Sequence, residues 1–117
     1  MTPEELNERL LEYAGRVLRL TSELPRTFAS KHIGEQLVRS ATSIGANYQE
    51  AQGGESKADF VHKLQISLKE SREASYWLRL LSKAAMGPQS SLQDLMKESI
   101  EIRAILSKAV ATAKSRS

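Results

Sequence analysis

The segment from residue 60 to residue 81 constrains the fold most, because apolar and small side chains recur there at alternating steps of four and three residues. These positions are Phe60, Leu64, Ser67, Ser71, Ala74, Leu78 and Leu81. This spacing places side chains on one side of an α-helix, and small residues within it let a neighbouring helix approach closely. We expect one helix over about 57–86, roughly 43 Å long at ~1.5 Å per residue, that packs along a partner helix.

Three further segments carry helical periodicity and are separated by proline and glycine breaks. The expected helices run over about 3–24, 31–52 and 91–114. Thr2 and Glu5 have the spacing of a capping box, and Pro25 ends the first helix. Gly53 and Gly54 are expected to end the second helix with a left-handed C-cap, and Gly87 and Pro88 end the third. Because the connections are short, consecutive helices run antiparallel, and the sequence predicts an all-α, up-down-up-down four-helix bundle.

Composition excludes several classes of protein. The chain of 117 residues is 40% hydrophobic and 26% charged, and it contains no cysteine. The lack of cysteine excludes disulfides, thiolate metal ligands and a cysteine nucleophile, and it is typical of a reducing compartment. The acidic N-terminus lacks the apolar run of a signal peptide, and no stretch reaches about 18 apolar residues. We expect one cytoplasmic domain over residues 1–117, without a membrane span.

The side of the long third helix opposite its apolar seam carries four cations and one aromatic residue. We call Lys69, Arg72, Tyr76, Arg79 and Lys83 the basic stripe. At ~100° per residue these side chains fall within an arc of about 100°. Cations in such an arc can follow a phosphate backbone, and Tyr76 can stack on a base. The stripe predicts RNA or DNA binding, and the alternative is a solvated face that provides solubility alone.

A second basic cluster lies at the C-terminus of a chain whose net charge is +3. It consists of Arg103, Lys108, Lys114 and Arg116, and no acidic residue occurs from position 103 onwards. Such a cluster adds long-range attraction for nucleic acid. Its alternative role is a favourable interaction with the negative end of the last helix.

A set of polar residues flanks the apolar faces of the second and third helices. On the second helix these are Arg39, Ser43, Asn47 and Glu50, and on the third they are Glu70, Glu73 and Trp77. Arg39 opposite one of the glutamates would pair two helices or two subunits. A large apolar side chain beside acids favours a second contact surface, and hence an oligomer. The alternative is a broad core face with a solvated polar edge.

Metal and catalytic patterns are weak. His32 with Glu35, and Asp59 with His62, have the carboxylate–histidine spacing of di-metal bundles, but two more inward carboxylates are missing. Arg26 and His32 have the spacing of the Arg-x(4–6)-His motif of a helical ribonuclease superfamily, but they lie in and just after a connection. We therefore expect no catalytic residue, no metal and no cofactor.

Several blocks of the sequence resemble a known family. Residues 34–51 (GEQLVRSATSIGANYQEA) resemble the central signature of the bacterial four-helix-bundle proteins encoded in 23S rRNA intervening sequences. The resemblance continues through 55–60 (ESKADF), 64–73 (LQISLKESRE) and 76–78 (YWL), and it spans roughly residues 6–85. It departs at Gln49, where an acidic or small residue is commoner.

The resemblance implies a ring-like homopentamer without known enzymatic activity. A protein similar to this family, the accessory variability protein of diversity-generating retroelements, is a basic pentameric bundle that binds nucleic acid and a reverse transcriptase. By position, the polar residues of the signature are Arg39, Ser43, Asn47, Glu50, Glu70 and Glu73. We expect a non-catalytic homo-oligomer that binds RNA or DNA, with a protein-interaction scaffold as the alternative.

Overall fold

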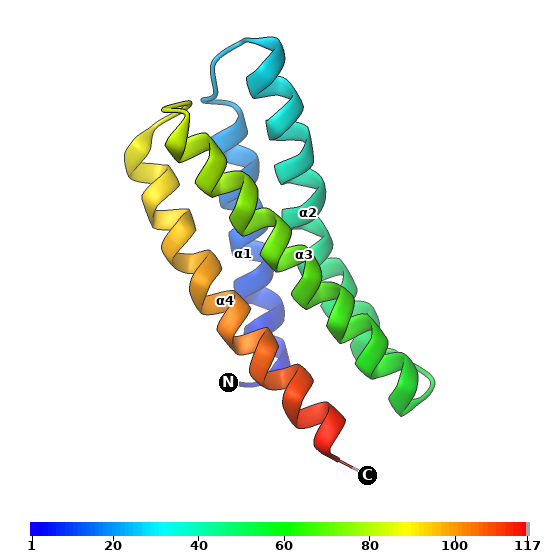
Figure 1. The fold of residues 1–117 in the computed structure, drawn as a ribbon. Helices are drawn as coiled ribbons and strands as arrows, with labels where there is room; N and C mark the ends of the chain where they lie inside the picture. The colour runs from blue at the N-terminus through cyan, green and yellow to red at the C-terminus, as the bar shows by residue number, and fades with distance from the viewer. Residues whose placement is uncertain (117) are drawn as a thin grey trace.

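The computed structural model describes residues 1–116, which form four α-helices joined by three short connections (Figure 1). The helices are α1 (Pro3–Thr21), α2 (Phe28–Gln52), α3 (Lys57–Lys83) and α4 (Gln89–Ser115). Consecutive helices run antiparallel along a molecule of about 49 × 21 × 20 Å, and residues 1–116 contain no strand. The predicted all-α bundle is confirmed. No helix among these residues is both long enough and apolar enough to cross a membrane.

The first helix begins as predicted and ends earlier. The Glu5 amide donates to Thr2 Oγ1 at 3.1 Å and the Thr2 amide donates to Glu5 Oε1 at 2.9 Å, which completes the capping box. The helix ends at Thr21 rather than at residue 24. The amides of the next three residues bond to carbonyls three positions back, and Pro25 disfavours a helical conformation at Leu24.

The second helix begins at Phe28, three residues before the predicted start at 31. Thr27 acts as its N-cap, because Thr27 Oγ1 accepts a hydrogen bond of 3.1 Å from the Ser30 amide. At the other end Gly53 has φ −92° and Gly54 has no positive φ, so the prediction of a left-handed C-cap was wrong. The following Gly54 lies in a crowded place, because a Cβ there would lie 2.7 Å from Asp59 Oδ2 and 3.1 Å from the Ala51 carbonyl oxygen.

The third helix ends at Lys83 rather than 86, in a Schellman motif. The Met86 amide donates to the Leu81 carbonyl at 2.9 Å, and the Ala85 amide donates to the Ser82 carbonyl at 3.1 Å. Ala85 has φ 54°, the left-handed conformation that this motif requires. The fourth helix starts at Gln89, two residues earlier than predicted. Pro88 occupies its N-cap position, without a hydrogen bond from a side chain.

The predicted seam of α3 forms the centre of the core. All seven seam residues except the half-buried Phe60 are buried, and so are Leu68 and Ser75, which lie outside the seam. The buried face is broader than one seam because α3 packs against both α2 and α4. Ser67 Oγ donates to the Ile44 carbonyl of α2 at 2.7 Å, so the small residue permits close helix contact.

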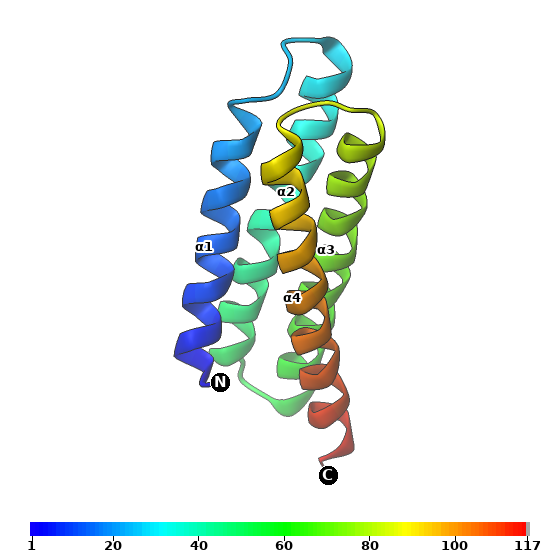
Figure 2. The same cartoon turned by 90° about the vertical axis from the view of Figure 1, so that its left-hand side faces the viewer.

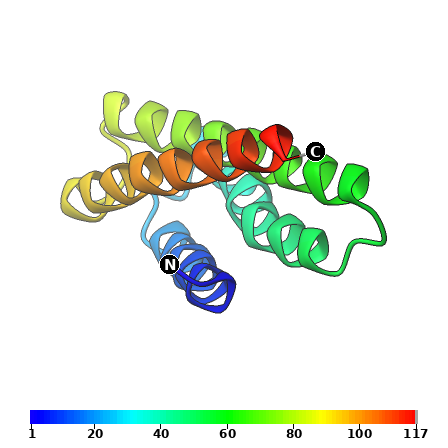
Figure 3. The ribbon, with the colours of Figure 1, turned by 90° about the horizontal axis from the view of Figure 1, so that it is seen from below.

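The remaining helix, α1, lies diagonally across the bundle from α3. Figure 2 shows α1 and α3 on opposite sides of α4, and the contacts of α1 are with α2 and α4. In Figure 3 α1 stands apart from the α3–α4 pair. It packs less extensively against α4 than against α2. The outer face of α3 therefore lies far from α1.

Candidate nucleic-acid interface

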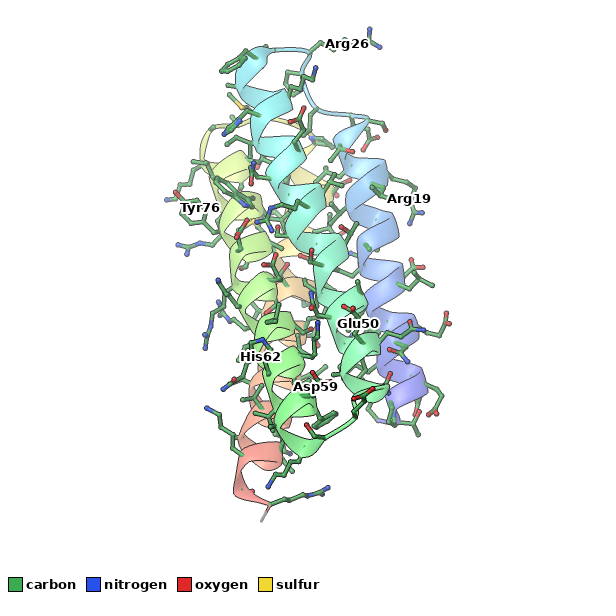
Figure 4. All side chains as sticks on the ribbon, turned by 90° about the vertical axis from the view of Figure 1, so that its right-hand side faces the viewer. Arg19, Arg26, Glu50, Asp59, His62 and Tyr76 are labelled. Atoms are coloured by element: carbon green, nitrogen blue, oxygen red, sulfur yellow. The ribbon has the colours of Figure 1, made fainter. Side chains whose placement is uncertain are left out.

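The basic stripe lies along an unbroken helix and faces outward. Lys69, Arg72, Tyr76, Arg79 and Lys83 are all exposed. Figure 4 shows Tyr76 and His62 on the outer side of α3, pointing away from α2. From Lys69 to Lys83 the stripe is about 21 Å long at ~1.5 Å per residue. Within residues 1–116, no acid lies within 4.0 Å of its four cations.

The charges of α4 are divided between two sides of the helix. Glu98 and Glu101 face α1, where they lie 2.8 and 3.7 Å from the Arg9 guanidinium. Arg103 and Lys114 are exposed and lie within about 40° of Gln89 around the helix. Gln89 accepts a hydrogen bond of 3.2 Å from Ser82 of α3, so this side of α4 borders α3. Arg103 and Lys114 therefore lie on the α3 side of α4, whereas Glu98 and Glu101 face α1.

The other predicted cation of α4, Lys108, is exposed on the outer side of the helix. At ~100° per residue it lies about 100° from Gln89, further from α3 than Arg103 and Lys114. Its predicted role in nucleic-acid binding stays a prediction.

Four members of the predicted polar flank meet between α2 and α3. Arg39 Nη1 donates to Glu70 Oε2 at 3.1 Å, and Arg39 Nη2 pairs with Glu73. Trp77 Nε1 donates to the same Glu73 carboxylate at 3.0 Å. The Glu70 side chain is only 12% exposed, whereas Arg39 is 48% exposed. These residues pair two helices of one chain, and their role between subunits stays a prediction.

The other three members of the flank do not join this network. Ser43 Oγ donates to the Arg39 carbonyl at 2.7 Å, and Asn47 Nδ2 donates to the Ser43 carbonyl at 2.9 Å. Both bonds stay within α2 and leave the guanidinium of Arg39 untouched. Glu50 lies 3.9 Å from Lys63 of α3, a separate and exposed ion pair.

Tyr76 links the basic stripe to the polar network. Its ring meets the Trp77 ring edge to face, with centroids 5.0 Å apart and planes at 75°. Tyr76 is still 56% exposed. On the helix surface its near neighbours are Arg72 and Arg79, four residues before and three residues after it. An exposed tyrosine therefore lies between two arginines along the outer side of α3.

Sequence reasoning missed a polar link between α1 and α4. Arg9 Nε and Nη2 donate to the two carboxylate oxygens of Glu98, both at 2.8 Å, and these bonds lower the pKa of Glu98. The hydroxyls of Tyr13 and Ser99 share a hydrogen bond of 2.6 Å. Burial raises the pKa of Tyr13 to about 12. The sequence did contain a signal for this hydrogen bond. Tyr13 and Ser99 lie on facing apolar stripes, and a buried hydroxyl needs a partner.

The two weak metal patterns lie on different helices, α2 and α3. His32 and Glu35 are exposed on α2, and His32 stacks on Phe28 with centroids 6.4 Å apart. Figure 4 places Arg26 at one end of the bundle, in the connection before α2, and His32 lies in the first turns of α2. In the part of the chain that the structure describes, no three His, Asp or Glu side chains gather as a metal site.

Comparison with known proteins extends the resemblance into α4. A family model described as 23S rRNA-intervening sequence protein matches residues 5–108. The chain is similar to a crystal structure of a protein with unknown function from the S23 ribosomal protein family of Bacteroides thetaiotaomicron VPI-5482. The two are 35% identical with a TM-score of 0.82, over 90% of this chain and 97% of that chain. No curated protein matches this chain.

Proposed function

The chain belongs to the 23S rRNA-intervening sequence protein family, and from that premise we propose a non-catalytic, homo-oligomeric bundle that binds RNA or DNA. The observation that carries the proposal is the basic stripe of α3, where four exposed cations have no acidic partner within 4.0 Å in residues 1–116. Phosphates are the abundant polyanionic partner that such a row of cations fits.

The salt dependence of this binding follows from counterion release. Four phosphate contacts give a slope of log affinity against log salt of about −2.8 for a single strand, or about −3.6 for a duplex. Raising salt from 50 to 200 mM then weakens binding roughly 50- to 150-fold. Arg103 and Lys114 border the stripe on α4 and make the dependence steeper.

The proposal that the protein is not an enzyme rests on its histidines. His32 and His62 are exposed on different helices, and neither forms an ion pair with a carboxylate in residues 1–116. A general base requires a partner that orients it and a nearby acceptor for its proton. The chain would then act by binding RNA or DNA. Its place of action would be the cytoplasm, where these targets lie.

Self-assembly is supported by exposed apolar residues on α1. Leu11 is 66% exposed and Leu18 is 50% exposed, two turns apart on one side of the helix. Because α1 is diagonal to α3, contacts between copies through α1 leave the stripe free. An assembly repeats the stripe and multiplies weak contacts into higher avidity. The resemblance implies a pentamer.

The same exposed leucines favour a second candidate, a scaffold that recruits another protein. An apolar patch on a helix surface suits a protein partner as well as a second copy. A pull-down after nuclease treatment separates the two functions. Recovery of one stoichiometric protein, together with no affinity for RNA or DNA, would favour the scaffold.

Charge reversal of the stripe tests the proposed function. The variant carries Lys69→Glu, Arg72→Glu, Arg79→Glu and Lys83→Glu. Its control carries Arg19→Glu, Arg26→Glu, Lys31→Glu and Lys57→Glu, which change four exposed cations outside the stripe and alter the net charge equally. Fluorescence anisotropy with a labelled mixed pool of RNA and DNA measures affinity between 50 and 200 mM salt.

We expect the unmodified protein and the control to bind with the steep salt dependence given above. The stripe variant should lose binding at every salt concentration. If the unmodified protein fails to bind the pool, or if the two variants bind equally well, the basic stripe is not a nucleic-acid interface.

A further inference from the structure

We infer that the basic stripe selects an unpaired strand over a duplex and stacks one base on Tyr76. The inference rests on the proposed function and adds the class of nucleic acid. A row of cations alone contacts phosphates of any form, so it cannot distinguish a single strand from a duplex. The tyrosine in the middle of the row supplies the distinction.

The position of Tyr76 suits a splayed base. Lys69 and Lys83 lie seven residues on either side of it, and Arg72 and Arg79 are within one turn. Bases of a duplex are stacked inside it, where a ring held against a rigid helix cannot reach their faces. Bases of a single strand are free to turn out and stack on an aromatic side chain. A strand that follows the cations would therefore place a base over Tyr76.

The inter-helix network holds Tyr76 in place. The ring rests against Trp77, whose indole donates to Glu73, and Glu73 pairs with Arg39 of α2. A ring already held by its neighbours loses less rotamer freedom when a base stacks on it. The edge-to-face contact occupies at most one face of the tyrosine ring. The 56% exposure of Tyr76 leaves area for a base.

The length of the stripe sets the size of the ligand. About 21 Å of α3 separates Lys69 from Lys83. A stacked strand advances about 3.4 Å per nucleotide, so roughly six nucleotides cover this distance. That size lies within the range of about 4–16 nucleotides known for single-strand binding sites. A 12-nucleotide strand is therefore long enough to fill the site of one protomer.

The test compares a labelled 12-nucleotide RNA with its own duplex at 100 mM salt. Anisotropy gives the affinities of the unmodified protein, of Tyr76→Ala and of Tyr76→Phe. Tyr76 is exposed, and alanine favours helix more than tyrosine does, so both variants should fold. Trp77, the chain's single tryptophan, adds a second readout, since a base stacked on the adjacent ring should change its emission.

The expected result is tighter binding of the single strand by the unmodified protein. Tyr76→Ala should weaken that binding roughly 5- to 150-fold while duplex affinity stays within about twofold, and Tyr76→Phe should keep the preference. Equal affinities for strand and duplex, with no effect of Tyr76→Ala, would overturn the stacking inference and leave the proposed function standing. If neither ligand binds, the proposed function fails instead.

Discussion

Two hydroxyls buried between α1 and α4 illustrate how single residues hold this bundle together. Tyr13 and Ser99 are both almost fully buried, and each hydroxyl satisfies the other. Removing one partner leaves the other without its hydrogen bond, at a cost of about 1–3 kcal/mol. The burial that requires this pairing also disfavours the phenolate form of Tyr13. The pair therefore makes the stability of the protein depend on pH in alkaline solution.

Tyr13→Phe should change that dependence. Burial raises the pKa of Tyr13 from 10.0 in the unfolded chain to about 12 in the folded protein. The stabilising contribution is complete below pH 10 and is lost as pH rises towards 12, because only the unfolded chain then releases the proton. Between pH 8 and pH 11.5, the free energy of unfolding should fall by roughly 2 kcal/mol more in the unmodified protein than in Tyr13→Phe.

Urea unfolding at pH 8 and pH 11.5, followed by Trp77 fluorescence, measures this difference. At pH 8 the variant should be less stable by about 1 kcal/mol, because Ser99 loses its partner. At pH 11.5 the order of the two proteins should reverse. Equal losses in both proteins would show that Tyr13 does not titrate as a buried group.

At the residue level, the sequence identified the polar side chains between α2 and α3, but it was less successful in predicting the partner of each one. Arg39 was expected opposite a glutamate, and its guanidinium in fact bridges Glu70 and Glu73. Ser43 and Asn47 were expected to join it, but each bonds to a carbonyl four residues back in its own helix. Such local bonds compete with bonds across helices, and spacing alone cannot decide between them.

At the level of helices, the seam of α3, the starts of α1 and α3 and the end of α2 were predictable, and the other helix ends were not. The 4–3 spacing of α3 correctly identified the side that packs against its neighbours. It missed Leu68 because a single seam describes contact with one helix, whereas α3 lies between two. The start of α2 was missed because Thr27 was placed in the connection rather than at the cap. The end of α3 was missed because alanine rarely adopts a left-handed conformation.

Ala85→Gly should stabilise the protein. Ala85 adopts φ 54°, which costs a residue with a Cβ about 1–2 kcal/mol and costs glycine little. The greater freedom of glycine in the unfolded chain offsets part of the gain. We expect the free energy of unfolding to rise by about 0.5–1 kcal/mol, measured by urea denaturation at pH 7.

Ala84→Gly is the matched control for this prediction. The neighbouring Ala84 has φ −82°, where glycine relieves no strain. Its substitution should lower the free energy of unfolding by up to about 1 kcal/mol. If both glycine variants are destabilised alike, the Schellman motif does not impose strain on Ala85.

For the whole molecule, the distribution of charge follows from the helix packing. Acids of α4 pair with Arg9 of α1, while Arg103 and Lys114 lie on the side that borders α3. The positions of the basic stripe were predictable from α3 alone. The orientation of the charges of α4 was not, because the rotation of one helix against another depends on tertiary contacts. Those contacts place Arg103 and Lys114 on the side of α4 towards α3, and Glu98 and Glu101 on the side towards α1.

Solution mass, determined by light scattering with and without a mixed RNA pool, tests the central claim that an assembled bundle binds nucleic acid through its basic surface. We expect a particle of several 13.0 kDa chains, about 65 kDa for a pentamer. At 50 mM salt RNA should increase that mass, and at high salt the increase should disappear. A particle of one chain, whose mass RNA leaves unchanged at 50 mM salt, would show that the protein neither assembles nor binds RNA.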